Sequence, residues 1–331
     1  MFIMSEVNFD LVDYTSLDES DPIDVMIPHD LAGCRLDQAL VSLLPDYSRS
    51  RLQQWIKDGS IKLNGELAQP KDKVWTDDTV SVLVPEEVDM DVIIPQAISL
   101  NIVFEDEDIM VINKPAGLVV HPGNGNWDNT LQNGLLFYNE QLKMVPRCGI
   151  VHRLDKDTNG LMVVAKTLAA HQDLVRQLQA RTVKRHYWAC VQGMLTIAGQ
   201  VDAPISRHPT QRTKMAVVAT GKEALTYYDV IERLPCHTLV ECHLATGRTH
   251  QIRVHMQFIG HPLAGDPIYG GKTPRFDEKS MAALKTLNRQ ALQAFRLGLI
   301  HPSTREYCEW SIPLAQDLIA LVEVLRDCRY E

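Results

Sequence analysis

The side chains best suited to chemistry lie in one short segment, residues 152–167, which reads HRLDKDTNGLMVVAKT. Its titratable groups, among them His152, Arg153 and Asp155, directly precede the mainly apolar run at residues 160–166. Such a run predicts a buried strand, and a rigid strand often holds binding or catalytic groups in the loop at its mouth. A polar loop before a strand is also a common structural feature, so this segment alone does not define a site.

Three further polar clusters make a shared site the better explanation. They are NKPAGLVVHPGNG at residues 113–125, TGRTHQIRVHM at residues 246–256 and GHPLAGDPIYGG at residues 260–271. Together with the first segment they supply Asp, Arg, His and Tyr side chains, which are suited to acid–base and nucleophilic chemistry.

Several known chemistries do not match these clusters. HRLD differs from the kinase HRD motif because Leu154 separates the Arg from the Asp. GNGNWDNT at residues 123–130 lacks the Lys-Ser/Thr ending of a phosphate-binding P-loop and the third glycine of a dinucleotide fingerprint. His250 and His255 are five residues apart rather than four, and Gln251 stands where a zinc protease has Glu. A site without metal or cofactor remains.

The elements that position these clusters follow one another in an irregular order. The patterns predict strands at residues 109–115, 117–122, 160–166, 186–193, 225–234 and 237–246. They predict helices at residues 168–181, 249–260 and 316–325, the second with Thr249 as its N-cap. Because helices and strands are mixed without a regular βα repeat, we predict an α+β fold for residues 101–331 rather than a doubly wound sheet.

A smaller domain is predicted at residues 27–84. Apolar residues recur at helical spacing between residues 36 and 44, and Ser48 is suited to cap a second helix over residues 49–58. Asn64-Gly65 is a strong signal for a hairpin turn. Residues 79–84 then follow the pattern of a closing strand.

The formal net charge of -9 arises from two acidic stretches. Residues 1–24 contain seven acidic side chains and residues 85–108 contain eight, and neither stretch has a Lys or Arg. The remainder carries 33 basic and 27 acidic side chains, a net charge of +6, so the acidic average does not exclude RNA as a partner. We expect residues 1–26 to be an acidic, disordered leader and residues 85–100 to be a linker.

Several bounds concern the compartment. No apolar run approaches the roughly 18 residues that suggest a membrane span, and the acidic N-terminus lacks the features of a secretory signal. The seven cysteines are scattered and form no CxxC pair, which favours reduced thiols over a disulfide framework or a zinc site. We therefore predict a cytoplasmic protein that does not act at a membrane.

The four polar clusters, in this order, resemble the motifs of the RluA-type pseudouridine synthase family. The preceding residues, with GCRLDQAL, SRSRLQQWI and IKLNG, are similar to the S4 RNA-binding domain that many members carry. The resemblance covers about residues 28–331. It implies a small S4-like domain followed by a catalytic domain with a mixed, mainly antiparallel sheet. One departure is Asn159, where the family usually has Ser or Thr, and we expect it to affect loop packing and not the reaction class.

The resemblance also implies roles for individual residues. Asp155 matches the catalytic carboxylate, Arg253 the basic residue that pairs with it, and Tyr187 the tyrosine that stacks on the extruded uracil and assists proton removal. Arg153 matches an arginine that helps to open the RNA stack, and Ile252 is expected to pack beside Tyr187. In the S4-like domain, the expected phosphate-binding side chains are Arg35, Arg49, Arg51, Lys57 and Lys62.

The chemistry of the implied reaction agrees with such a site. Conversion of uridine to pseudouridine breaks a C–N bond and forms a C–C bond to the same uracil, without redox change or energy input. One ionised carboxylate can attack the sugar or the base as a nucleophile and then leave, so no cofactor is needed. We therefore predict an isomerase that acts on large-subunit ribosomal RNA or on the assembling large subunit. Because the target base must leave the stack, a stem-loop is the expected substrate.

Two alternatives stay open. The first is a related member of the family that acts on other uridines of large-subunit RNA. The second is a non-catalytic RNA-binding protein or RNA chaperone on the same scaffold. The presence of Asp155, Tyr187 and Arg253 together argues against the second.

Overall fold

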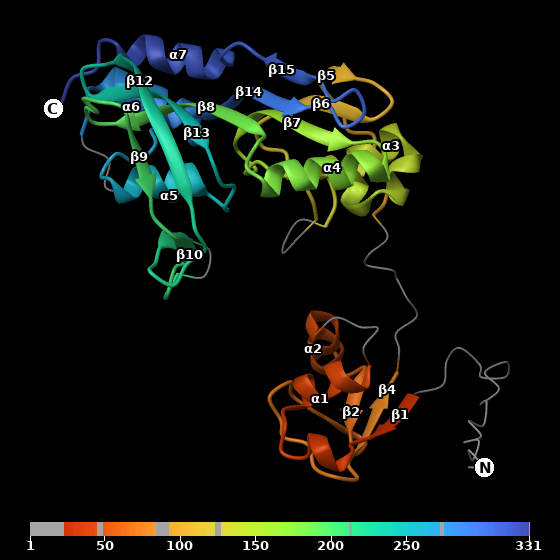
Figure 1. The fold of residues 1–331 in the computed structure, drawn as a ribbon. Helices are drawn as coiled ribbons and strands as arrows, with labels where there is room; N and C mark the ends of the chain where they lie inside the picture. Colours follow the sequence, from red (N-terminus) through yellow and green to blue (C-terminus); the bar gives the residue numbers. More distant parts are fainter. Residues whose placement is uncertain are drawn as a thin grey trace, which may run out of the picture. The chain divides into compact units, whose positions relative to one another are not determined.

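The computed structural model describes residues 23–44, 49–83, 93–122, 127–211, 214–271 and 275–330. The chain divides into two compact units, Met1–Val92 and Ile93–Glu331 (Figure 1). Each unit has its own hydrophobic core. None of the helices in the described ranges is both long and apolar enough to cross a membrane.

The first unit is a small sheet packed against helices α1 (Leu36–Leu43) and α2 (Arg49–Lys57). Its strands are β1 (Ile23–Met26), β2 (Ile61–Leu63), β3 (Glu66–Leu67) and β4 (Thr79–Val82), in the antiparallel order β1-β4-β2-β3. Asn64 and Gly65, between β2 and β3, have φ values of 52° and 81°. A two-residue hairpin turn with positive φ at both positions is the geometry that Asn-Gly favours, so the predicted hairpin is confirmed.

The prediction that residues 1–26 form a disordered leader is wrong for residues 23–26. These residues form β1, which pairs along its whole length with β4 and sets Val25 opposite Val80. The Asp24 side chain accepts a hydrogen bond from the Ser81 hydroxyl, so an acidic residue that suggested a leader takes part in the sheet. Residues 1–22 lie outside the described part of the chain.

The second unit is built on one large sheet with the strand order β5-β6-β7-β14-β8-β13-β12-β9, and β15 also pairs with β14 (Figure 1). Among the described strands, β7 and β14 run parallel and the other paired strands run antiparallel. The predicted α+β fold with a mixed, mainly antiparallel sheet is therefore confirmed. The strands are β5 (Ile102–Glu105), β6 (Ile109–Lys114), β7 (Asn159–Ala165), β8 (Lys184–Gln192), β9 (Gly199–Asp202), β12 (Leu225–Arg233), β13 (His237–Leu244), β14 (Leu292–Ile300) and β15 (Tyr307–Ser311), with a separate hairpin of β10 (Ile205–Arg207) and β11 (Met215–Val217).

Helices cover both faces of this sheet. One face packs against α3 (Leu131–Tyr138) and α5 (Gln251–Phe258) in the main core, which includes Tyr187. The other face packs against α4 (Leu168–Gln179), α6 (Glu278–Leu287) and α7 (Gln316–Leu325). Because side chains alternate along a strand, Tyr187 on β8 faces the first set of helices, whereas Trp188 packs with the second.

Two predictions for this unit are wrong. Residues 117–122 form no strand, and their ladder is limited to an isolated bridge between Val119 and Thr130. One reason is that the Leu118 carbonyl accepts a hydrogen bond from the Lys114 side chain. Residues 93–100, which we expected to belong to the linker, pack on the second unit, where the Ile94 carbonyl accepts from Asn133 Nδ2 at 2.9 Å.

Candidate active site

The loop that carries Asp155 is held where it enters β7. All seven residues of β7 are buried, and Leu154 is packed in the main core. The Asp155 carbonyl accepts a hydrogen bond from the Thr158 amide at 3.1 Å, which closes a turn. Gly160 has a φ of 127°, and a Cβ there would lie 2.1 Å from the Ala294 carbonyl oxygen. Only glycine therefore allows the close parallel contact between β7 and β14.

Arg253, on α5, lies between two carboxylates. Its Nη1 donates to Asp155 Oδ2 at 3.0 Å, while its Nε and Nη2 donate to the two oxygens of Asp266 at 2.7 and 2.9 Å. Burial opposes the charge of Arg253, which is 3% exposed, but the two carboxylates outweigh this effect and raise its pKa. The structure thus brings together Asp155 and Arg253, which are 98 residues apart in sequence.

Asp266 is a site residue that the sequence did not single out. Its Oδ1 also accepts hydrogen bonds from the amides of Ile268 and Tyr269, both at 2.9 Å. Burial opposes ionisation of Asp266, but the Arg253 contacts and these amides together lower its pKa. The Tyr269 ring lies 4.9 Å from the Arg253 guanidinium carbon, a distance at which a cation and an aromatic ring attract. Asp266 therefore fixes the Arg253 guanidinium, and Nη1 is left to reach Asp155.

Tyr187 lies on β8, where it pairs with Cys242 of β13 and Ala294 of β14. It shares the main core with Ile252 and is 6% exposed. Burial raises the pKa of Tyr187 to about 12, with Asp155 adding to the shift and Arg185 opposing it. The phenol is therefore protonated at neutral pH.

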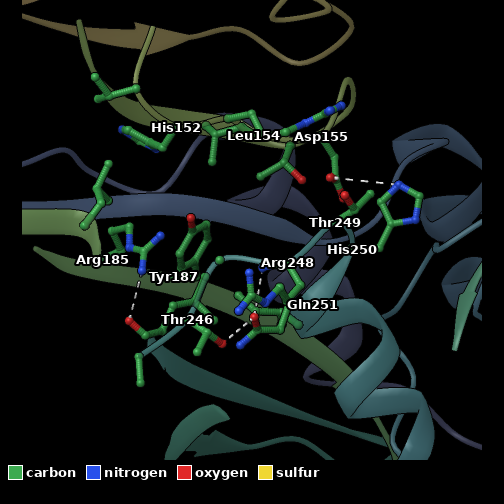
Figure 2. Close-up of a pocket in the computed structure, with 18 of the residues that line it drawn as sticks. His152, Leu154, Asp155, Arg185, Tyr187, Thr246, Arg248, Thr249, His250 and Gln251 are labelled. Carbon is green, nitrogen blue, oxygen red and sulfur yellow. Dashed lines mark hydrogen bonds and ion pairs between the residues drawn. The ribbon is translucent and has the colours of Figure 1, made fainter. Parts of the chain in front are cut away.

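Asp155, Tyr187, Ile252 and Arg253 line a cavity of about 570 Å³. Figure 2 shows Asp155, from the loop before β7, and Tyr187, from β8, on different walls of this space. Exposed Arg153 lies at the cavity, and Ile252 and Arg253 complete the wall formed by α5. The volume falls within the range of about 300–1,000 Å³ that is typical of small-molecule sites. Other polar residues of the lining include His121, Arg147, His152, Arg185, Thr246, Arg248 and His250.

The side chain of Gln251 holds the loop at residues 245–250 in place by hydrogen bonds. Its Oε1 accepts from the Thr246 hydroxyl at 2.7 Å and from the Arg248 amide at 3.0 Å, and its Nε2 donates to the Leu225 carbonyl at 3.0 Å. The helix begins at Gln251, and its N-cap is His250, with a φ of 58°. The prediction that Thr249 caps this helix is therefore wrong.

Arg185 and Lys114 are two buried basic side chains near the site. Arg185 Nη2 donates to the Leu244 carbonyl at 3.5 Å, and its Nε has no hydrogen-bond partner among the described residues. Lys114 is 1% exposed and donates to the carbonyls of Pro115, Leu118 and Lys156 at 2.8, 2.8 and 2.9 Å. Because burial dominates, the pKa of Lys114 is lowered to about 7. Lys114 thus ties residues 115–118 to the Asp155 loop.

The histidines of the motifs differ in their surroundings. His152 Nε2 accepts from the Val163 amide at 3.1 Å, and burial lowers the pKa of His152 to about 3, so this ring is neutral and structural. His250 Nδ1 lies 2.7 Å from the Tyr269 hydroxyl, and its Nε2 lies 3.9 Å from Asp155 Oδ1. Of the two, His250 is the one close to the Asp155 carboxylate.

The predicted RNA-binding residues of the first unit fall into two groups. Arg35 and Arg49 are half exposed, but both donate to the buried carboxylate of Asp37, at 2.9 and 2.8 Å. Burial opposes ionisation of Asp37, yet hydrogen bonds from Arg35, Arg49 and Gln53 lower its pKa to about 2. The two arginines are therefore part of the fold of this unit. Lys57 and Lys62 are exposed, and the side chain of Arg51 lies outside the described part of the chain.

Comparison with known proteins agrees with this architecture. The RNA pseudouridylate synthase family matches residues 108–258, and the S4 domain matches residues 34–80. The chain is 52% identical over 312 residues to ribosomal large subunit pseudouridine synthase D of Nitrosomonas europaea, covering 94% of this chain and 90% of that protein. It is 51% identical over 301 residues to the protein of the same name from Escherichia coli strain K12, covering 89% and 91%.

A solved structure shows the same fold. Human RNA pseudouridylate synthase domain containing 4 matches 68% of this chain and 93% of its own, with a TM-score of 0.55 and 27% identity. The match in sequence extends over both units. The match in fold covers 68% of this chain, and the second unit carries the Asp155–Arg253 pair at its cavity. The chain therefore belongs to the RNA pseudouridylate synthase family, with an N-terminal S4 domain.

Proposed function

We propose that this protein isomerises uridine to pseudouridine in large-subunit ribosomal RNA, with Asp155 as the nucleophile. The reaction class follows from the family, and the substrate is inferred from the names of the relatives. The observation that carries the assignment of Asp155 is its ion pair with Arg253 at the wall of the cavity. A carboxylate oriented by a guanidinium is suited to nucleophilic attack.

Asp155 and Tyr187 have different roles in the proposed isomerisation. Asp155 attacks the sugar or the uracil ring, the glycosidic C–N bond breaks, and the uracil rotates before a C–C bond forms. After attack on the sugar the carboxylate is expelled as the C–C bond forms, and after attack on the ring it is expelled later. The ring carbon then loses its proton and the ring nitrogen gains one, so atoms balance without a cofactor. Tyr187 packs against the uracil. Because the pKa of Tyr187 is raised to about 12, we assign it to stacking rather than to proton removal.

Delivery of the target uridine involves the exposed cations. Extruding a base costs on the order of a few kcal/mol, least where the base is unpaired, so the expected substrate is a stem-loop. Arg153, exposed at the cavity, is the side chain that we assign to the gap left in the RNA stack. Lys57 and Lys62 of the first unit supply phosphate contacts.

The compartment and the target are part of the same proposal. An enzyme of ribosomal RNA without a membrane-spanning helix in its described residues is expected in the cytoplasm, acting on free RNA or on the assembling large subunit. A related family member that acts on other large-subunit uridines is the second candidate, since the cavity residues described above are compatible with either.

The test is a map of pseudouridines in ribosomal RNA from cells that lack the protein. We expect pseudouridine to be missing from a small set of large-subunit positions and to return with the wild-type gene. The Asp155→Asn gene should not restore it, whereas Asp157→Asn, the same change of charge two residues away, should. Loss of pseudouridine only from other RNAs would contradict the proposed substrate, and restoration by Asp155→Asn would contradict the proposed nucleophile.

A further inference from the structure

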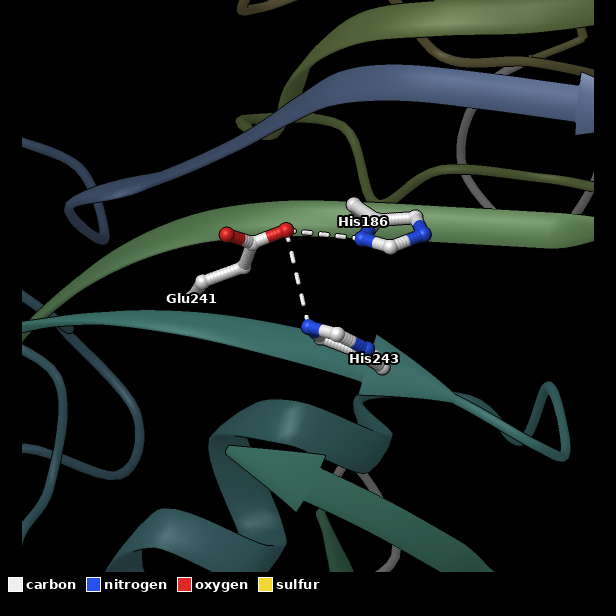
Figure 3. Close-up of side chains that lie close together, drawn as sticks. All are labelled: His186, Glu241 and His243. Atoms are coloured by element: carbon white, nitrogen blue, oxygen red, sulfur yellow. Dashed lines mark hydrogen bonds and ion pairs between the residues drawn. The ribbon is translucent and has the colours of Figure 1, made fainter. Parts of the chain in front are cut away.

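A second group of titratable side chains lies away from the active-site cavity, on β8, β12 and β13. Figure 3 shows His186, Glu241 and His243 converging. Strand pairing sets His186 directly opposite His243, and Asp229 of β12 directly opposite Glu241. Because side chains alternate along strands, the cluster lies on the opposite face of the sheet from Tyr187 and Cys242.

The distances in the cluster are close to those of a metal site. His186 Nδ1 lies 2.7 Å from Glu241 Oε1, and His243 Nε2 lies 3.5 Å from the same oxygen. Asp229 Oδ2 lies 3.4 Å from His243 Nε2. Ligands about 2.0–2.1 Å from a tetrahedral zinc ion are separated by about 3.3 Å. Both contacts of His243 already have this separation, and the shorter contact of His186 needs to open by about half an ångström.

We propose that His186, Glu241 and His243 bind one divalent transition-metal ion of the zinc class, with Asp229 or water as the fourth ligand. Two imidazoles favour such an ion over Mg²⁺ or Ca²⁺, which prefer oxygen ligands. Glu241 and Asp229 together balance the two charges of the ion.

The state of His243 supports this assignment. Its Nε2 is buried and has no hydrogen-bond partner among the described residues, although it faces the Glu241 and Asp229 carboxylates. An imidazole nitrogen without a hydrogen-bond partner is available to a metal ion.

Binding here would join β8 to β13 directly behind Tyr187. His186 and Tyr187 are neighbours on β8, and Tyr187 pairs with Cys242, which lies between the two ligands of β13. An ion at this position therefore holds together the two strands that support the active-site tyrosine. Because an ion that binds only the folded state stabilises it, the melting temperature should rise with the concentration of Zn²⁺.

The experiment titrates the full-length protein with Zn²⁺ in a calorimeter and with Co²⁺ in a spectrophotometer. Three variants are compared with the wild type: His243→Gln and Glu241→Gln remove a ligand each, and His29→Gln makes the same change at an exposed histidine of the first unit. Circular dichroism without metal checks that each variant is folded. Glu241→Gln preserves the shape of its side chain, so it keeps the test open if His243→Gln does not fold.

We expect one equivalent of Zn²⁺ on the wild type and on His29→Gln. Loss of an outer-shell partner typically weakens metal binding about 10–100-fold. Loss of a ligand should weaken it by at least as much. The Co²⁺ complex should show d–d bands without the charge-transfer band of a thiolate ligand. The proposal is overturned if the wild type binds no ion, if a thiolate band shows that cysteines bind it, or if the two ligand variants bind as tightly as the wild type. In these cases the cluster is a hydrogen-bonded contact between strands.

Discussion

The two carboxylates that contact Arg253 are expected to differ sharply in what they contribute to stability. Asp266 accepts four hydrogen bonds, two from Arg253 and two from backbone amides, and its side chain is fully buried. In Asp266→Asn, an NH₂ group replaces one of these oxygens and faces an N–H donor. Breaking a buried ion pair in this way costs about 3–5 kcal/mol. Asp155 is 15% exposed on its side chain and accepts one bond from Arg253, so Asp155→Asn should cost less, about 1.5–3 kcal/mol.

The assay is denaturant unfolding of the full-length protein, with hydrogen exchange of the β7 and β8 amides used to report on the second unit. Asp157→Asn is the matched control, because it removes a charge in the same loop. Equal losses of unfolding free energy for Asp266→Asn and Asp155→Asn, or a larger loss for Asp155→Asn, would refute the assignment of Asp266 as the anchor of Arg253. Both variants should lose activity, since Asp266→Asn releases the guanidinium that orients the nucleophile.

Other regions of the chain give three further predictions. Burial lowers the pKa of His152 from its ordinary 6.5 to about 3 in the folded protein. Between these values His152 binds a proton in the unfolded state but not in the folded state, so the unfolding free energy should fall as pH drops from 6.5 towards 3. A titration of stability against pH should show a smaller fall in His152→Gln, and an identical fall would exclude His152 as the source. Gly160→Ala places a Cβ 2.1 Å from a carbonyl oxygen. Backbone strain alone costs about 1–3 kcal/mol, so this variant should lose more unfolding free energy than that or fail to fold. Gly117→Ala, with a φ of 85° and open space, is the control, and similar unfolding midpoints would contradict the steric argument. Replacing Lys57 by Ala should reduce the slope of log affinity against log salt by about 1 if this side chain contacts a phosphate, and an unchanged slope would show that it does not.

The sequence predicted most of the regular elements of the second unit because their apolar periodicity is strong. Helix α7 has the predicted bounds, Gln316–Leu325, and β7 is the buried strand expected after the polar loop. The errors occur where a tertiary contact decides. Strand β1 is four residues long and contains an acid, and it forms because β4 offers an edge. Residues 117–122 form no strand, and the Leu118 carbonyl bonds to the Lys114 side chain instead of to a neighbouring strand.

The site was predictable in part. Asp155, Tyr187 and Arg253 came from the resemblance to a family, and the structure places all three at one cavity. Asp266 could not be found from periodicity or spacing, because its importance comes from a contact with Arg253 across a loop and two backbone amides. Arg185 gave one usable signal, since it lies two residues before Tyr187 on the same strand and must therefore share its face.

The central claim is that the carboxylate of Asp155 is the nucleophile. The most direct test measures tritium release from RNA that carries 5-tritiated uridine, using the wild type, Asp155→Asn and Asp157→Asn, together with the RNA affinity of each protein. We predict that Asp155→Asn releases no tritium above background while it binds RNA with nearly unchanged affinity, and that Asp157→Asn retains activity. Tritium release by Asp155→Asn at a substantial fraction of the wild-type rate would contradict the account.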